Sequence, residues 1–292
     1  MNTPHPPGNE QDILVAGGAG FIGSHLHQQI GGEIFDRRTG QEGLDLALVK
    51  ERVRGKELVY HLANIPAHRL SVSSPYEVLH NNYLVTLNFA EACRLHDVKM
   101  VFASSFGVYG KQPLPFKEDG LLAPTTPYGA GKKACEELLQ LYHDLYGMDV
   151  IIVRPSNVWG DRDSLHEPLQ VLPLWLRKVQ AGEELVVHGE LTSRDFTHVS
   201  DFVAGIRKAA AWKGFEVFNI CAGQEIRLLD IARSLTGQVR VEPLPPTEVE
   251  RWQGDITKAR SLLEWQPRVR FWEEFSRYAA SRLGRPITVK EV

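Results

Sequence analysis

A glycine-rich turn near the N-terminus constrains the fold more than any other feature. Gly17, Gly20 and Gly23 follow the short apolar run of residues 13–16 and precede a segment that can be helical to about Ile30. An apolar run, a tight turn and a helix in this order predict the first unit of a parallel α/β sheet. Glycines at this spacing let a pyrophosphate approach the backbone, and the helix N-terminus supplies N–H groups for it. The turn therefore predicts a dinucleotide site.

An acidic residue after the second apolar run supports this prediction. Asp36 follows residues 33–35 and lies nineteen positions after Gly17, close to the spacing of about 20 at which a carboxylate binds the adenosine ribose hydroxyls. An acid here favours NAD, because it would repel a 2′-phosphate. Arg37 and Arg38 follow at once, and either could accept that phosphate. NADP is therefore the less favoured alternative.

Further apolar runs alternate with helix-compatible segments along the first half of the chain. The runs lie at residues 58–62, 100–103 and 150–153, and the longest helical segments at residues 76–95 and 127–146. This alternation predicts a Rossmann-type, doubly wound parallel sheet that is covered on both faces.

The pattern changes beyond Arg154, where prolines and tryptophans separate shorter elements. This change predicts a smaller C-terminal α/β domain on the substrate side. We expect the dinucleotide-binding domain at residues 12–154 plus about 188–220, the substrate domain at about 155–187 plus 221–286, and a flexible tail at 1–11.

Composition excludes several other classes of protein. The chain is 43% hydrophobic and 24% charged, as in ordinary globular proteins. Its net charge of −3 gives no global field to gather nucleic acid or anionic lipid, and no apolar stretch is long enough for a membrane span. Neighbouring charges such as Glu136 and Glu137 are expected on solvated faces. Cys93, Cys135 and Cys221 form no Cys-x-x-Cys pair, which predicts neither disulfides nor a metal site and favours a reducing cytoplasm.

Further along the chain, two serines, a tyrosine and a lysine are suited to chemistry on a hydroxyl group. Tyr128 and Lys132 are four positions apart in a predicted helix, so both can point at one ligand. A tyrosine pKa near 10 makes a poor base at pH 7, but an adjacent ammonium would favour the phenolate. Ser104 and Ser105 follow a predicted strand, where open α/β sheets bind ligands.

Six segments follow one another in a characteristic order: residues 17–23, His61-Leu62-Ala63, residues 104–110 (SSFGVYG), Tyr128 with Lys132, residues 154–160 (RPSNVWG) and residues 194–201 (RDFTHVSD). In this order the chain resembles the extended short-chain dehydrogenase/reductases, specifically their nucleotide-sugar epimerase/dehydratase family, over about residues 12–267. The resemblance implies an NAD(P)-dependent enzyme that oxidises a sugar carbon of a nucleoside-diphosphate sugar.

The resemblance also implies roles for individual residues. Tyr128 would be the base, Lys132 would bind the nicotinamide ribose and lower the tyrosine pKa, and Ser105 would hold the reacting hydroxyl. Besides Tyr128 and Lys132, the implied cofactor-binding residues are Gly17, Gly20, Phe21, Ile22, Gly23, Asp36, Arg37, Asp45, Leu46, Leu62, Ala63, Asn82 and Ser104. Besides Ser105, the implied substrate-binding residues are Asn157, Arg194 and Arg251, the last in place of a family arginine expected near Pro245.

Two positions separate this chain from the family's dehydratases and decarboxylases. Phe106 and Gly107 stand where those relatives have acids, so the pattern resembles the 4-epimerases, which need a base, a hydride acceptor and room for a 4-keto sugar to rotate. A 4-ketoreductase of a nucleotide deoxysugar uses the same three residues and is the alternative. A non-catalytic NAD(P)-binding protein is less favoured. The family's dimer helices match residues 84–92 and 134–145, which predicts a homodimer.

Overall fold

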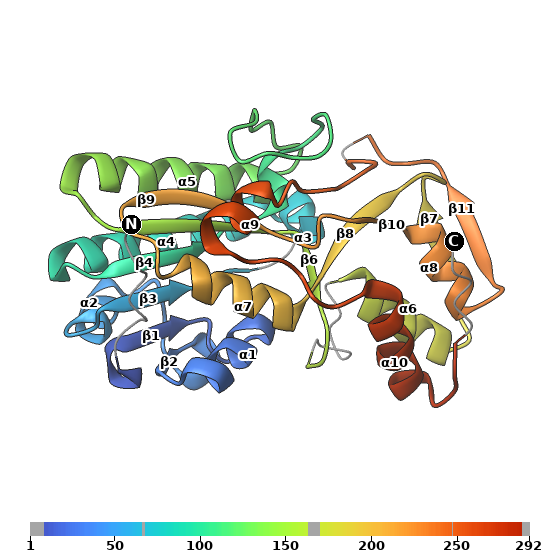
Figure 1. Ribbon diagram of the computed structural model, residues 1–292, viewed down its shortest axis with the longest axis horizontal. Coiled ribbons are helices and arrows are strands. Elements are labelled where there is room, and N and C mark those ends of the chain that lie inside the picture. The colour runs from blue at the N-terminus through green and yellow to red at the C-terminus, as the bar shows by residue number, and fades with distance from the viewer. Residues whose placement is uncertain (1–8, 66–67, 163–169, 247, 288–292) are drawn as a thin grey trace.

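A six-stranded parallel sheet forms the centre of the larger part of the molecule (Figure 1). The computed structural model describes residues 9–65, 68–162, 170–246 and 248–287. In sheet order, the strands are β2 (Glu33–Phe35), β1 (Ile13–Ala16), β3 (Leu58–His61), β4 (Lys99–Ala103), β5 (Val150–Pro155) and β9 (Phe215–Ile220). Every neighbouring pair is parallel. All the carboxyl ends therefore lie at one edge, where open α/β sheets bind ligands.

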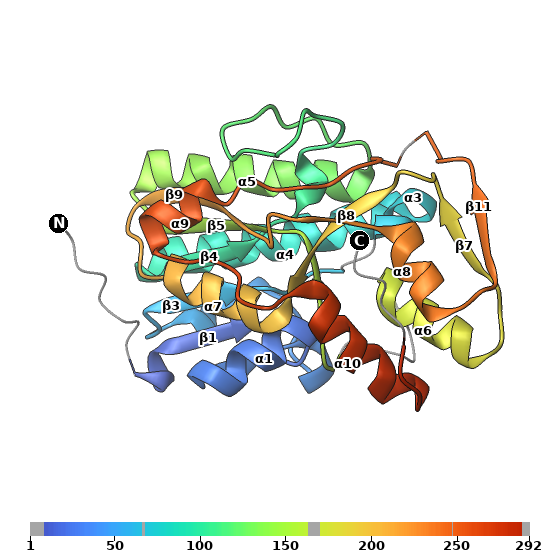
Figure 2. The ribbon, with the colours of Figure 1, turned by 45° about the vertical axis from the view of Figure 1, so that its right-hand side comes forward.

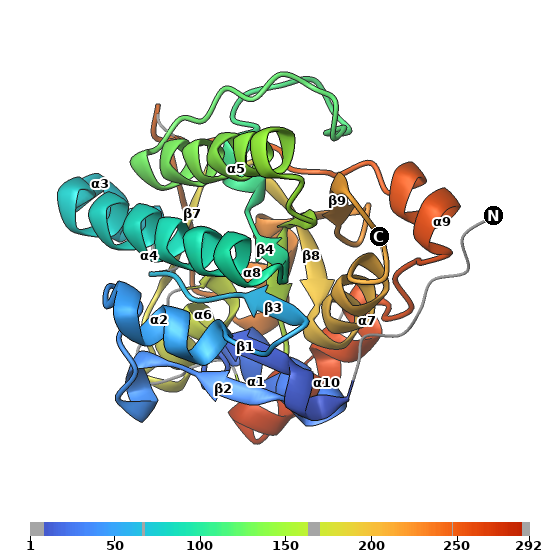
Figure 3. The ribbon, with the colours of Figure 1, turned by 90° about the vertical axis from the view of Figure 1, so that its left-hand side faces the viewer.

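Helices cover both faces of this sheet, as Figure 3 shows. On one face lie α1 (Phe21–Ile30), α7 (Val199–Ala209) and α9 (Thr257–Leu263), and on the other lie α2 (Leu46–Val53), α4 (Pro75–His96) and α5 (Pro127–Tyr146). Strand residues alternate between two cores, because successive side chains point to opposite faces. Val15 and Tyr60 pack in the first core, Leu14 and Val59 in the second. The predicted doubly wound sheet is confirmed.

A smaller unit lies beside the carboxyl edge of the sheet (Figure 2). Its three-stranded sheet consists of β10 (Glu225–Arg227), β8 (Ser193–His198) and β6 (Asn157–Trp159), and a second pair consists of β11 (Val239–Glu242) and β7 (Leu185–His188). The helices α6 (Val171–Gln180), α8 (Leu228–Leu235) and α10 (Phe271–Leu283) share one apolar core with these strands. The remaining elements are α3 (His68–Ser73) and the 3-10 helices η1 (Glu10–Asp12), η2 (Arg37–Thr39) and η3 (Phe106–Val108).

The chain passes between the two units more often than in the predicted division into domains. Residues 193–198, expected in the dinucleotide-binding domain, form β8 and pair with β6. Residues 257–263, expected in the substrate domain, form α9 and pack against β9. The reason is that β6 follows β5 with one residue between them. The chain therefore passes directly from the carboxyl edge of the first sheet into the second sheet, where β8 pairs with β6.

Residues 1–8 of the predicted tail lie outside the described residues, and residues 10–12 form η1. Of the helices that the structure describes, none combines the length and the hydropathy needed to span a bilayer.

Candidate active site

The glycine turn is closed by contacts that leave no room for a side chain. Gly17 has a φ of +85°, and a Cβ on it would lie 2.7 Å from the Ala63 nitrogen. A Cβ on Gly23 would lie 2.1 Å from the Gly17 oxygen. The remaining predicted residues of the turn lie at the start of α1: Gly20, Phe21 and Ile22. The backbone N–H groups at this helix start form the cradle that a pyrophosphate requires.

Asp36 is tied into the same turn. Its Oδ2 accepts a hydrogen bond from the Ala19 N–H at 3.1 Å, and its Oδ1 accepts one from the Arg38 N–H at 2.9 Å. Arg38 in turn donates from Nη1 to the Ala19 oxygen at 2.9 Å, whereas Arg37 is an exposed residue at the start of η2. Because a carboxylate has about four acceptor positions, Asp36 keeps the capacity to bind ribose hydroxyls.

Asp45 and Asn82 both hydrogen-bond backbone groups. Asp45 is the N-cap of α2, which begins at the predicted Leu46, and its Oδ1 accepts hydrogen bonds from the N–H groups of residues 47 and 48. Asn82 accepts a hydrogen bond from the Ile65 N–H at 2.7 Å and donates one to the Ile65 oxygen at 3.2 Å. This pair of bonds fixes the segment that carries Leu62 and Ala63, so Asn82 acts on the turn through backbone.

Ser105, Tyr128 and Lys132 come together where β4 ends. The Ser105 Oγ accepts a hydrogen bond from the Gly107 N–H at 3.1 Å, and the Ser105 side chain lies close enough to Tyr128 to lower the pKa of its phenol. Lys132 is 3% exposed, and its Nζ donates to the Ala103 oxygen at 2.7 Å. The structure therefore brings the three predicted catalytic side chains to one corner at the carboxyl edge of the sheet.

Ser104 adds an unsatisfied hydroxyl to this corner. Its Oγ is buried and has no hydrogen-bond partner among the described residues, and such a group costs free energy unless a ligand binds it. Asp36, the glycine turn and Ser104 with Lys132 thus present a carboxylate, a backbone cradle and a polar end in succession. This donor set fits a dinucleotide.

Burial controls the electrostatics of the corner. Desolvation raises the pKa of Tyr128 to about 12, against the opposing effect of its hydrogen bond with Ser105. Desolvation also lowers the pKa of Lys132 to about 8, which the charge of Glu136 opposes. We expected Lys132 to lower the tyrosine pKa. The Lys132 Nζ donates to the Ala103 oxygen and lies 6.0 Å from the centre of the Tyr128 ring, and its effect on the tyrosine pKa stays a prediction.

Glu136, expected on a solvated face, is buried at 5% exposure. It forms a bidentate pair with Arg154, with Nε–Oε1 at 3.1 Å and Nη2–Oε2 at 2.7 Å. Arg154 also donates to the Tyr109 hydroxyl at 3.0 Å. The expectation is wrong because Glu136 follows Lys132 by one helical turn and shares its buried face, whereas the Glu137 side chain is 66% exposed. The spacing from Lys132 was the signal that could have identified this residue.

Asn157 and Arg194 lie on the adjacent strands β6 and β8. Asn157 donates from Nδ2 to the Asp195 oxygen at 3.2 Å. Arg194 pairs through Nη2 with Glu248 Oε2 at 3.2 Å, and its side chain is 11% exposed. Burial lowers the pKa of Arg194 to about 10, so the guanidinium keeps its charge at pH 7.

Aromatic rings connect Arg194 to the catalytic corner. Its guanidinium lies 5.1 Å from the centre of the Trp252 ring, and the Trp252 and Phe106 ring centres are 6.2 Å apart. Phe106 directly follows Ser105. Packed aromatic rings thus connect Arg194 with the residue that follows Ser105.

Arg251 is held elsewhere. Its Nε and Nη2 both bind the Glu225 carboxylate, at 2.9 and 2.6 Å, and its side chain is 56% exposed. Arg251 and Arg194 are thus engaged by different carboxylates, and no contact in the described part of the chain joins the two guanidinium groups.

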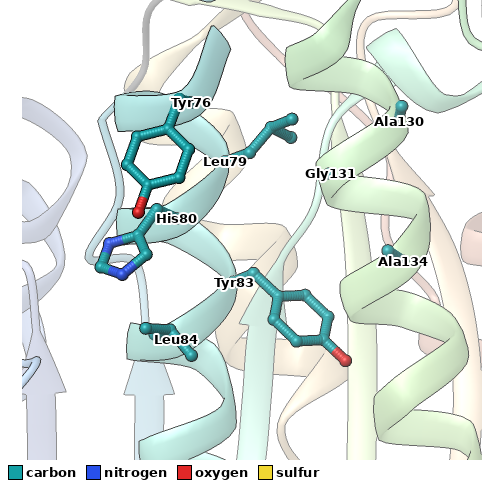
Figure 4. A pocket seen from close by; sticks show the side chains of 8 residues that line it. All are labelled: Tyr76, Leu79, His80, Tyr83, Leu84, Ala130, Gly131 and Ala134. Atoms are coloured by element: carbon teal, nitrogen blue, oxygen red, sulfur yellow. The ribbon is translucent and has the colours of Figure 1, made fainter.

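The outer faces of α4 and α5 form an apolar groove of about 550 Å³ (Figure 4). The lining residues are Tyr76, Leu79, His80, Tyr83 and Leu84 from α4 and Ala130, Gly131 and Ala134 from α5. Tyr76 is 79% exposed, and the groove lies beside the first turns of the helix that carries Tyr128.

The sequence matches a known protein family and several of its enzymes. The model of the NAD dependent epimerase/dehydratase family matches residues 13–221. The chain belongs to this family. It is 31% identical to the UDP-glucose 4-epimerase of Mycolicibacterium smegmatis over 88% of this chain and 93% of that one. A dTDP-glucose 4,6-dehydratase of Streptomyces niveus is 29% identical over 89% of each chain.

The fold has solved counterparts as well. The structure of a UDP-glucose 4-epimerase from Thermotoga maritima with UDP-glucose superposes with a TM-score of 0.84, at 27% identity, over 91% of this chain and 97% of that one. The recognised family and the Rossmann-type fold are thereby confirmed, and enzymes of both epimerase and dehydratase type are among the relatives.

Proposed function

We propose that the protein is an NAD-dependent epimerase that inverts C4 of a nucleoside-diphosphate sugar through a transient 4-keto intermediate. The observation that carries the proposal is the corner of Ser105, Tyr128 and Lys132 at the sheet edge beside the glycine turn, with no acid at the two positions after Ser105. The epimerases of Mycolicibacterium smegmatis and Thermotoga maritima support the same reaction class.

The three side chains divide the work. Tyr128 takes the proton of the C4 hydroxyl and returns it, while Ser105 hydrogen-bonds the oxygen on which charge develops. When bound, NAD+ supplies the hydride acceptor and a positive charge beside the phenol. That charge matters because burial raises the pKa of Tyr128 to about 12. Lys132 binds ribose hydroxyls from its place against the Ala103 oxygen.

NAD is favoured over NADP by Asp36. Its carboxylate stands at the turn where the adenosine ribose would lie, and it would repel a 2′-phosphate. Arg38, which contacts the turn, keeps NADP as the alternative.

A second reaction uses the same corner. A 4-ketoreductase of a nucleotide deoxysugar needs the same base and serine, and it would consume NAD(P)H. A 4,6-dehydration needs an acid near C6, which Phe106 and Gly107 cannot supply. Epimerisation is therefore preferred to the reaction named for the Streptomyces relative.

We also propose that the groove between α4 and α5 is the contact between two copies of the chain. Its lining is almost wholly apolar, and an exposed apolar surface of this kind favours association. Light scattering should give the mass of a dimer, and a Tyr83→Glu variant should give that of a monomer. A monomeric wild-type protein would exclude this contact.

The three cysteines are free and buried, which suits a reducing cytoplasm.

Proton NMR of the purified protein with UDP-, dTDP- and GDP-sugars and substoichiometric NAD+ tests the reaction. Conversion of one sugar into its C4 epimer, in excess of the cofactor added, establishes redox-neutral epimerisation. Stoichiometric oxidation of NAD(P)H by a 4-keto sugar would replace it with the ketoreductase. No reaction with either set would leave the non-catalytic alternative.

A further inference from the structure

The guanidinium of Arg194 has one open edge. Nη1 donates to the Ser193 oxygen at 2.8 Å and to the Glu250 oxygen at 3.2 Å. Nη2 contacts the Glu248 carboxylate through one oxygen only, at 3.2 Å, and no bond to Nε is found within the described ranges. The Nε–Nη2 edge is the one that binds two oxygens of a carboxylate or phosphate in parallel. On Arg194 this edge is only half engaged.

Arg251, in contrast, has its Nε–Nη2 edge fully engaged. Arg251 uses both Nε and Nη2 on Glu225, and the Ser193 hydroxyl donates to the same carboxylate at 2.5 Å. At Arg251 both N–H groups of this edge are occupied, whereas at Arg194 the Nε–H has no bond within the described residues. Of the two arginines, Arg194 is therefore the one with an N–H group left for an incoming oxygen.

Glu248 is placed opposite Arg194 by its backbone. The Glu248 N–H bonds the Pro245 oxygen at 3.0 Å, and the next residue, Val249, is buried at 8% exposure in a core cluster that includes Phe106. The Glu250 oxygen accepts the Ser193 N–H at 3.0 Å. Since the segment is anchored on both sides of the carboxylate, displacement requires only rotation of the Glu248 side chain, which is 28% exposed.

From this geometry we infer that Glu248 is a resident counter-ion on Arg194, which the diphosphate of the substrate displaces and which thereby sets the affinity for that diphosphate. The inference rests on the proposed function, because it takes the ligand of Arg194 to be a nucleoside diphosphate. The bound state loses the Arg194–Glu248 pair and keeps a carboxylate near the phosphates. Both effects oppose binding, and both disappear when the carboxylate is neutral.

A resident carboxylate also selects among anions. A singly charged anion gains no more from Arg194 than Glu248 already does, whereas a diphosphate carries more charge and can bind both N–H groups of the edge. Glu248 therefore keeps small monovalent anions off the guanidinium while it admits the substrate.

Calorimetric titration of the full-length protein with UDP and with inorganic pyrophosphate tests the inference. Glu248→Gln keeps the size of the side chain and removes its charge, and we expect both ligands to bind about tenfold more tightly. The matched control is Glu273→Gln, which removes the same charge from an Arg–Glu pair on α10 and should leave both affinities unchanged. Glu248→Asp, which keeps the charge, should not tighten binding.

Each outcome decides a different point. Equal or weaker binding to Glu248→Gln overturns the role of Glu248, while epimerase activity in the NMR assay would still support the proposed function. Tighter binding without turnover supports Glu248 as the counter-ion and counts against epimerisation. If neither UDP nor pyrophosphate binds to the wild type or to Glu248→Gln, both proposals fail.

Discussion

The corner of Ser105, Tyr128 and Lys132 and the pair of Arg194 with Glu248 achieve their geometry by different means. At the corner, Lys132, Glu136 and Arg154 are almost fully buried, and each has its partners at short distances. Arg194 and Glu248, in contrast, meet through one longer contact between partly exposed side chains. The first arrangement is preorganised by folding, whereas the second can exchange one anion for another. Substitutions at the corner should therefore affect stability and turnover, and substitutions of Arg194 or Glu248 should mainly affect the binding of the proposed diphosphate.

The largest expected effect is on turnover at the corner. Tyr128→Phe removes the hydroxyl that bonds Ser105, so proton transfer loses its base and kcat should fall by about 10²- to 10⁴-fold. NAD binding, measured by calorimetry, should persist, because the glycine turn and Asp36 are untouched. Wild-type turnover by the variant would refute the assignment of Tyr128.

The buried ion pair should dominate stability. Glu136→Gln leaves Arg154 charged, buried and without its counter-ion, and the free energy of unfolding in urea should fall by about 3–5 kcal/mol. The control is Glu137→Gln on the same helix, whose carboxylate is exposed and lies 3.7 Å from Lys133, with an expected change of less than about 0.5 kcal/mol. Similar losses in the two variants would show that burial does not distinguish the two pairs.

Lys132 should make the free energy of unfolding depend on pH. Burial lowers its pKa from 10.5 to about 8, so between these values the folded chain binds fewer protons than the unfolded chain. The free energy of unfolding therefore gains a contribution that rises with pH across this window, by about 3 kcal/mol in all. Lys132→Met should lack this contribution when urea unfolding is followed across the same range. A parallel pH profile in the two proteins would contradict the lowered pKa.

Features that depend on local spacing could be predicted from the sequence, and contacts between distant segments could not. The glycine turn, Asp36 and the Tyr128/Lys132 pair have their meaning in local spacing, so strand, turn and helix patterns locate them. Contacts between distant segments leave no such pattern. Glu248 lies 54 positions from Arg194, and nothing in the residues around it indicates the pairing. Two adjacent glutamates do not by themselves reveal that Glu136 is buried, and only its spacing of four residues from the buried Lys132 indicates it.

A smaller effect is expected in the glycine turn. Gly23→Ala places a Cβ 2.1 Å from the Gly17 oxygen, so α1 has to shift and the free energy of unfolding should fall by about 1–3 kcal/mol. NAD affinity should fall with it, since the shifted N–H groups form the cradle. The control is Gly237→Ala, where no atom lies within 4 Å of the added Cβ. Equal stability of the two variants would show that the turn tolerates a side chain.

The smallest effect is expected for the exposed pair of Glu225 with Arg251. Glu225→Gln breaks the bidentate bonds to Arg251, but the arginine is 56% exposed and its charge can be solvated in place. The free energy of unfolding should therefore change much less than in Glu136→Gln, although the bonds are as short as those of the Glu136–Arg154 pair. Urea unfolding of the two glutamine variants side by side isolates burial as the variable. A loss for Glu225→Gln as large as that for Glu136→Gln would mean that geometry, and not desolvation, sets the strength of these pairs.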